Sequence, residues 1–162
     1  MKVTGGHDTR VSLAALIAVR PGCRPRLIFR THRARRADKR KGFTETDYAR
    51  FLDAAHQQLG RPVVLVWDNL NTHVSGAMRE LIAARDWLTV FQLPSYASEL
   101  NPVESLWALL KRSLANLVKR SLGELTALVK TRLRRMQYRP GLLIAFLART
   151  RLDLTPLCNP RN

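Results

Sequence analysis

The stretch VVLVWDN, residues 63–69, decides the fold, because an unbroken apolar and largely β-branched run ends abruptly at two polar residues. Such a run predicts a strand at residues 63–67 that is buried on both faces, as in a sheet covered by helices. A second apolar run at residues 88–94 predicts another buried strand, and residues 73–86 between them have the apolar spacing of a helix. We therefore expect the two strands to pair in parallel through a right-handed crossover.

The chain before this strand predicts a hairpin and then a helix. Residues 11–19 and 26–32 are apolar runs joined by a Pro-Gly turn, which indicates an antiparallel pair. After Thr44, apolar residues recur at helical spacing; Thr44 is placed to cap this helix and Asp47 is its third residue. A hairpin followed by two parallel strands predicts a mixed α/β sheet with flanking helices, which is a ribonuclease-H-like architecture.

Two further helices are predicted after the second parallel strand. Residues 102–117 and 122–137 carry apolar side chains at helical spacing, and the apolar tail at residues 141–148 is expected to pack back on the core. The second of these helices is strongly basic, so we expect it to contact a DNA backbone. Its cationic residues, with one just beyond it, are Lys130, Arg132, Arg134, Arg135 and Arg139.

Composition indicates one folded domain with a polyanionic partner. A length of 162 residues suits a single domain, and 46% hydrophobic with 25% charged residues excludes disorder as the main state. The 28 Lys and Arg against 12 Asp and Glu leave a net charge of +16, which favours nucleic acid as the partner. Cys23 and Cys158 have no second thiol nearby, so a disulfide scaffold is not expected. No apolar run is long enough for a membrane span or a signal peptide, so we expect a cytoplasmic protein with no membrane association.

Two acids lie where this layout would place a reaction centre. Asp68 follows the first parallel strand, and Glu104 lies in the first turn of the helix after the next one. Ligands of α/β sheets gather at the carboxyl ends of the strands, so we expect both carboxylates to meet at one edge. Paired carboxylates suit Mg²⁺ or Mn²⁺, and two such ions about 4 Å apart promote phosphodiester chemistry. Asp68 and Glu104 are therefore the candidate catalytic and metal-ligating residues.

Each acid also has a structural interpretation that stays open. Asp68 begins an Asn- and Asp-rich string, DNLNTH, in which such side chains often bond the backbone in an Asx-turn. Glu104 would complete a capping box if Asn101 caps the helix and Pro102 is its first residue. His73 either caps the following helix or contacts the candidate site.

Further cationic residues are candidates for binding nucleic acid. Lys111 lies seven residues after Glu104 on the same helical stripe, about 10 Å along the axis, where it could hold a phosphate, and Arg112 follows it. Trp107 on that stripe is expected in the core. The basic stretch at residues 33–42 predicts a solvated loop that contacts phosphates. Its candidate residues are Arg35, Arg36, Lys39, Arg40 and Lys41.

The strings VLVWDNLNTH and LPSYASELNPVESLWALLKR resemble the second and third acidic blocks of DDE transposases of the mariner-like superfamily, in its bacterial insertion-sequence branch. In that family the middle Asp ends a strand within a D-N-x-x-x-H string, and the last acid lies in an N-P-[VIL]-E string about 35 residues later; residues 69–103 give the same interval here. The resemblance extends from about residue 11 to the tail. It implies that Asp68 and Glu104 are metal ligands and that DNA at the ends of a mobile element is cut and joined with magnesium or manganese at a two-metal site.

The sequence departs from this family in three places. The family has a third carboxylate on a strand that precedes the hairpin, and we expect this chain to lack that strand and the amino-terminal helix-turn-helix region. Asp8 is the sole acid before Asp38, and no apolar run precedes it. Ser95 and Ser98 replace prolines that relatives often have, so we expect a looser loop before Glu104.

The combined prediction is a single, amino-terminally incomplete DDE catalytic domain at residues 1–162, located in the bacterial cytoplasm at the nucleoid. It would work with an upstream transposase product or as a homodimer, and enzymatic activity of the isolated chain stays open. Two alternatives are a non-catalytic, basic nucleic-acid-binding remnant with a ribonuclease-H-like fold, and a nuclease of this fold that acts on junctions or RNA hybrids.

Overall fold

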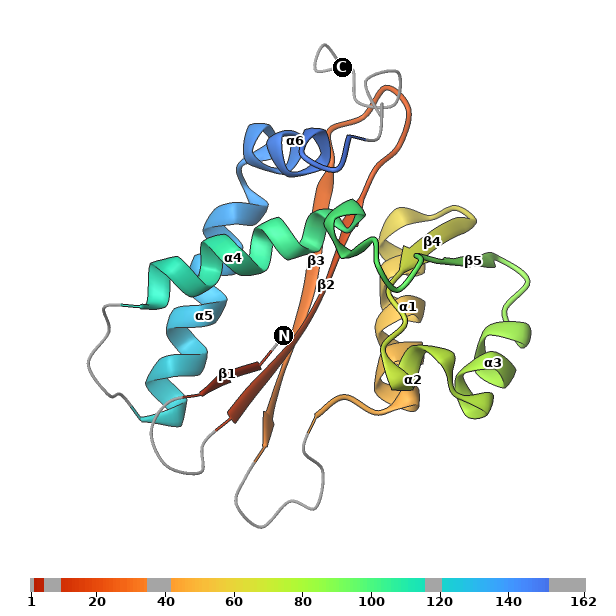
Figure 1. The fold of residues 1–162 in the computed structure, drawn as a ribbon, viewed down its shortest axis with the longest axis horizontal. Helices are drawn as coiled ribbons and strands as arrows, with labels where there is room; N and C mark the ends of the chain where they lie inside the picture. The colour runs from red at the N-terminus through yellow and green to blue at the C-terminus, as the bar shows by residue number, and fades with distance from the viewer. Residues whose placement is uncertain (1, 5–9, 35–41, 116–120, 152–162) are drawn as a thin grey trace. The chain divides into compact units, whose positions relative to one another are not determined.

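The computed structural model describes residues 2–4, 10–34, 42–115 and 121–151 (Figure 1). The chain divides into two compact units: residues 1–42 with residues 102–162, and residues 43–101. None of the helices in the described ranges is both long and apolar enough to cross a bilayer.

The first unit contains a three-stranded antiparallel sheet in the order β1-β2-β3. Strand β2 (Arg10–Ala18) pairs along its whole length with β3 (Arg26–Ala34), which confirms the predicted hairpin. Its turn contains Gly22 at a φ of +71°, a conformation that glycine adopts without steric cost. Strand β1 (Lys2–Thr4) pairs with the start of β2, so a strand precedes the hairpin where none was expected, because three residues without an apolar pattern give no sequence signal.

Three helices pack against this sheet. They are α4 (Pro102–Leu114), α5 (Leu122–Gln137) and α6 (Pro140–Ala148), and α6 contacts both of the others, so the prediction that the apolar tail packs on the core is confirmed. The Gln137 side chain donates a 2.7 Å hydrogen bond to the Leu27 carbonyl and ties the end of α5 to β3. The core of the unit consists of Val11, Leu13, Leu27, Leu106, Trp107, Leu110, Leu125, Val129, Leu133, Met136, Leu143 and Phe146.

The second unit contains a parallel pair of strands and the helices between and before them. Its elements are α1 (Glu45–Leu59), β4 (Val63–Trp67), α2 (Asn71–Val74), α3 (Gly76–Ala83), β5 (Leu88–Gln92) and the 3-10 helix η1 (Ser98–Leu100). The β4 and β5 strands are parallel, with Val63 opposite Leu88 and Trp67 opposite Gln92, as predicted. Thr44 and Asp47 form the predicted capping box at the start of α1.

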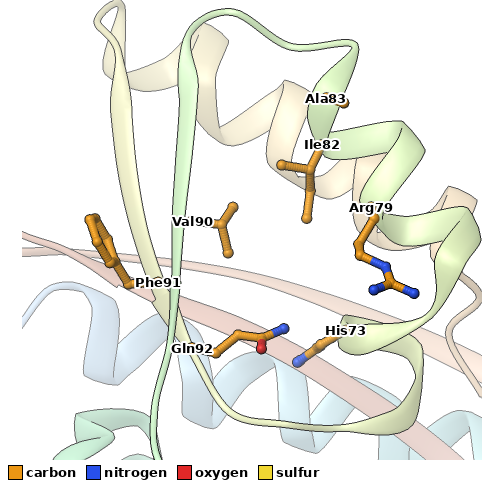
Figure 2. Close-up of a pocket in the computed structure, with 7 residues that line it drawn as sticks. All are labelled: His73, Arg79, Ile82, Ala83, Val90, Phe91 and Gln92. Carbon is orange, nitrogen blue, oxygen red and sulfur yellow. The ribbon is translucent and has the colours of Figure 1, made fainter.

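The strands of the described residues form two sheets, one in each unit, where one continuous mixed sheet was expected. The predicted burial of β4 on both faces is wrong: Leu65 and Trp67 are buried, whereas Val64 is 67% and Val66 is 52% exposed. Successive side chains of a strand point to opposite faces, and only one face of this pair is turned to the helices of its unit. The second strand, β5, behaves in the same way, since Val90 faces Ile82 of α3 and Phe91 points away (Figure 2).

The predicted helix at residues 73–86 is two helices. It begins earlier, at Asn71, and is interrupted at Ser75, whose backbone is extended at a φ of −64° and a ψ of 154°. The Ser75 hydroxyl accepts a hydrogen bond from the Met78 amide at 3.2 Å and caps α3. A serine that satisfies the first amides of a helix stabilises a new start at that point.

Candidate active site

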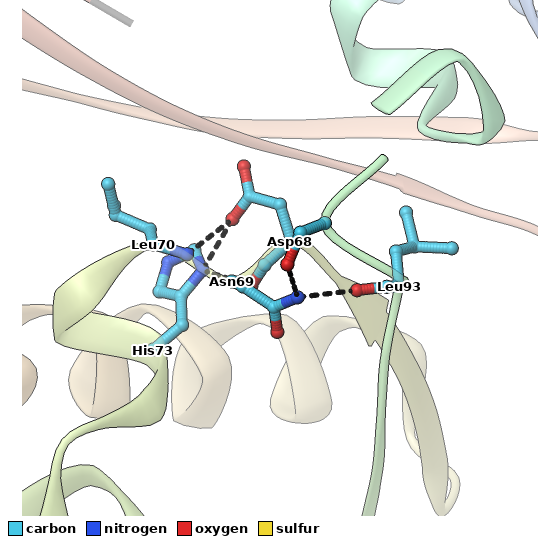
Figure 3. Close-up of polar contacts among 6 residues, drawn as sticks. Asp68, Asn69, Leu70, His73 and Leu93 are labelled. Atoms are coloured by element: carbon cyan, nitrogen blue, oxygen red, sulfur yellow. Dashed lines mark hydrogen bonds and ion pairs between the residues drawn. The ribbon is translucent and has the colours of Figure 1, made fainter. Parts of the chain in front are cut away.

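Asp68 directly follows β4, and its side chain is held by its own turn (Figure 3). Oδ1 accepts a hydrogen bond from the Leu70 amide at 3.4 Å and from Nδ1 of His73 at 2.8 Å. The bond to the amide two residues later is the predicted Asx-turn contact, so this structural interpretation is confirmed. The side chain is nevertheless 48% exposed, and within the described residues Oδ2 makes no hydrogen bond. The turn therefore leaves one carboxylate oxygen available to a ligand.

His73 is enclosed by aromatic rings. Its own ring lies parallel to that of Trp67, with centroids 4.0 Å apart and an interplanar angle of 3°, and Tyr48 meets it edge-on at 4.7 Å and 82°. Only 9% of the residue is exposed. An ionised carboxylate only accepts hydrogen bonds, so Nδ1 must carry the proton that it donates to Asp68. Of the two interpretations offered for His73, contact with the candidate acid is what the structure shows.

The surroundings of His73 shift the pKa values of two neighbouring groups, Asp68 and Tyr48. The hydrogen bond from His73 lowers the pKa of Asp68 below its usual value, against the opposing effect of partial burial, so the carboxylate is ionised at neutral pH. Burial, and secondarily the negative charge of Asp68, raise the pKa of Tyr48 to about 12. Tyr48 is therefore a neutral phenol that packs beside a carboxylate.

Asn69 connects the ends of the two strands. Its Nδ2 donates to the Leu93 carbonyl at 2.7 Å and to the Ser95 hydroxyl at 3.2 Å (Figure 3). The serine supplies an acceptor that a proline side chain lacks, and the expected looser loop before Glu104 stays a prediction. The bond to Leu93 was not predicted, because its two residues lie 24 positions apart and no local sequence pattern connects them.

Glu104 lies in the first turn of α4, two residues after Pro102, and its side chain is exposed. Lys111 and Arg112 are exposed in the last turn of the same helix. Trp107 is only 6% exposed, which confirms its assignment to the core. A capping-box role for Glu104 stays a prediction.

The two candidate acids belong to different compact units, Asp68 to residues 43–101 and Glu104 to residues 102–162. Their meeting at one edge therefore stays a prediction. Among residues 2–4, 10–34, 42–115 and 121–151, no three His, Cys, Asp or Glu side chains come together in a metal-binding group. Several predicted residues lie outside the described ranges, namely Asp8, Arg35, Arg36, Lys39, Arg40 and Lys41.

A pocket of about 390 Å³ lies between α3 and β5, with His73 at its margin (Figure 2). Its lining is mostly apolar, with three polar side chains. These are His73, Arg79 and Gln92, and the apolar members are Ile82, Ala83, Val90 and Phe91. His73, which lines the pocket, also contacts Asp68.

A partly buried ion pair links two segments of the same unit. Arg85 binds Asp53 through two contacts, Nε to Oδ1 at 2.7 Å and Nη2 to Oδ2 at 2.8 Å, and also donates to the Leu81 carbonyl. The pair joins α1 to the end of α3, and its hydrogen bonds lower the pKa of Asp53. It was not predicted, because 32 residues separate its members.

Comparison with known proteins gives a family and a fold. A family model described as "DDE superfamily endonuclease" matches residues 26–128. Among similar solved structures is one titled "Structure of Mos1 transposase catalytic domain and Raltegravir with Mn"; it has a TM-score of 0.57 and 13% identity and covers 94% of this chain and 84% of that one. The search of curated proteins found no match. The structural match confirms the predicted ribonuclease-H-like fold class.

Proposed function

The chain belongs to the DDE superfamily of endonucleases, and from this premise we propose that it acts as the catalytic domain of a transposase, cleaving and joining DNA at the ends of a mobile element. The observation that carries the proposal is the state of Asp68. It is an ionised, half-exposed carboxylate at the carboxyl end of a parallel strand, anchored through one oxygen and open at the other. A carboxylate in this state can bind a hard divalent cation through its free oxygen.

Asp68 and Glu104 are the residues that would hold Mg²⁺ or Mn²⁺. Their donor chemistry fits, because hard divalent cations prefer carboxylate oxygens and both side chains reach solvent. When bound, such ions polarise a phosphodiester and lower the pKa of an attacking water or hydroxyl. The chain's own contribution is to keep Asp68 ionised and oriented through His73, and to fix the strand end through Asn69.

DNA is the proposed partner, supported by the net charge of +16 and by exposed cationic side chains on two helices. Each phosphate contact by Lys or Arg adds affinity that falls steeply with salt. The exposed cations are Lys111 and Arg112 on α4 and Lys130, Arg134 and Arg135 on α5. We place the protein at the bacterial nucleoid, where it works with a second copy or with an upstream transposase product.

The test is metal-dependent nicking and strand transfer on duplex DNA that carries the terminal repeats flanking the gene. The full chain is assayed with and without the product of any reading frame directly upstream. Asp68→Asn and Glu104→Gln should each abolish Mg²⁺-dependent cleavage, and Gln at position 104 still satisfies a capping box. Glu99→Gln, which alters another exposed acid, is the matched control and should cleave normally.

Cleavage that survives Asp68→Asn would refute the metal assignment. The chain could instead bind DNA with a steep salt dependence and no sequence preference, and show no metal-dependent cleavage with or without the upstream product. That result would support the non-catalytic nucleic-acid-binding alternative.

A further inference from the structure

His73 has a stronger hold on Asp68 than any other described residue. The Nδ1 to Oδ1 distance is 2.8 Å, whereas the Leu70 amide lies at 3.4 Å, near the limit for a hydrogen bond. Hydrogen bonds to an ionised acceptor are the short and strong ones. The orientation of the carboxylate therefore depends mainly on the imidazole.

The imidazole in turn has little freedom to move. Trp67 covers one face of its ring in a parallel stack and Tyr48 closes an edge, so the ring cannot rotate without breaking both contacts. Trp67 is the last residue of β4 and is itself 94% buried. A rigid strand thus fixes the ring, and the ring fixes the carboxylate.

The chemistry of the residue suggests that packing is not its purpose. Among the described residues, Nε2 of His73 is buried without a hydrogen-bond partner, an arrangement that costs stability. A phenylalanine would stack equally well between Trp67 and Tyr48 and would bury no unpaired nitrogen. What the histidine adds is the Nδ1–H group that meets Asp68.

We propose that His73 is a positioning residue for Asp68: its Nδ1–H holds Oδ1 against the turn and so directs Oδ2 toward the metal and the DNA phosphate. The inference rests on the proposed function, in which Asp68 is a metal ligand. Groups that orient a ligand from behind typically change metal affinity or activity by about 10- to 100-fold when they are removed.

Two substitutions distinguish the effect of the Nδ1–H donor of His73 from the effect of its aromatic ring. His73→Phe keeps the aromatic stack and removes the donor, whereas His73→Asn removes the ring and keeps an amide N–H close to the Nδ1 position. Both are made in the full chain, and thermal unfolding checks that each folds. Mn²⁺ affinity is measured by electron paramagnetic resonance, and Mg²⁺-dependent nicking is measured on the same preparations.

We expect His73→Phe to fold and to lose about 10- to 100-fold in Mn²⁺ affinity and nicking, and His73→Asn to recover most of that loss. Equal impairment of the two variants, or normal metal binding by His73→Phe, would overturn the inference. If Asp68→Asn also binds Mn²⁺ and cleaves normally, the proposed function fails as well; if Asp68→Asn is inactive while His73→Phe is normal, only the positioning role fails.

A metal-free measurement tests the same idea independently of activity and of whether His73→Phe folds. In the native chain at neutral pH, ¹⁵N spectra of His73 should show the proton on Nδ1, and ¹³C relaxation of the Asp68 carboxyl should show an ordered group. His73→Asn should keep that order. A proton on Nε2 alone, or a carboxyl that is already mobile in the native chain, would contradict the proposal.

Discussion

Replacement of Asn69 by alanine removes the tether between the two strand ends. The 2.7 Å bond to the Leu93 carbonyl should contribute about 1 kcal/mol and the longer, exposed bond to Ser95 about half as much, within the usual range for neutral hydrogen bonds. The sum of about 1.5 kcal/mol corresponds to a fall in Tm of about 3–6 °C for a domain of this size. Thermal unfolding of the full chain, followed by circular dichroism, measures it.

Three companion variants make this prediction specific. Ser95→Ala loses only the weaker bond and should lower Tm by about 1–2 °C. The double variant should be no less stable than Asn69→Ala, because the first substitution already removes both bonds. Asn69→Asp has nearly the same size but places a carboxylate against the Leu93 carbonyl, so it should destabilise at least as much as alanine. If Ser95→Ala costs as much as Asn69→Ala, or if the two losses add fully, the tether as described is wrong.

Three further predictions concern acid stability, packing and DNA binding. The lowered pKa of Asp53 means that its pairing with Arg85 stabilises the fold above about pH 3.8 and that this contribution is lost as pH falls through the folded-state pKa. The native chain should therefore have a higher urea midpoint than Asp53→Asn at pH 7, and the two midpoints should converge in strong acid; a difference that does not change with pH would contradict this. Leu133→Ala empties a site that is fully buried under α5 and should cost about 2–5 kcal/mol in urea denaturation, and a loss under 1 kcal/mol would contradict the packing. The exposed pair Arg134 and Arg135, changed to Gln together, should reduce the slope of log affinity for duplex DNA against log salt by about 2, and an unchanged slope would remove this face of α5 from the DNA contacts.

Local signals account for most of what the sequence predicted correctly. Residues 63–67 and 122–137 match β4 and α5 to the residue, because an apolar run ends at a polar turn in one and a capping box opens the other. Ser121 and Glu124 form that box. Such signals lie within a few positions of the boundary that they set.

The errors arose where burial or pairing depends on distant residues. An apolar run at β4 suggested burial on both faces, yet the exposure of Val64 and Val66 shows that hydrophobicity alone does not say which face meets a neighbour. The break at Ser75 did have a signal, since serine before glycine favours a new helix start, but the apolar spacing on either side concealed it.

The candidate site was predicted only where its contacts lie close together in the sequence. Asp68 was identifiable because it follows a strand directly, and the Asx-turn contact was foreseen from its local composition. The role of His73 was left between two interpretations, since a ring stack with Trp67 and Tyr48 needs the fold to bring α1 to the strand end. The Asn69 tether could not be predicted, because its acceptors lie beyond β5.

The contact between Asp68 and His73 has a consequence for how this sequence can vary. The strand end, the acid, its turn and the stacked ring all lie within the seven consecutive residues 67–73. Insertions or deletions in loops elsewhere leave that spacing untouched, but one residue added between Asp68 and His73 would rotate the imidazole about 100° around the short helix and away from the indole. The acid therefore requires a fixed number of residues in this turn as well as the histidine at its end.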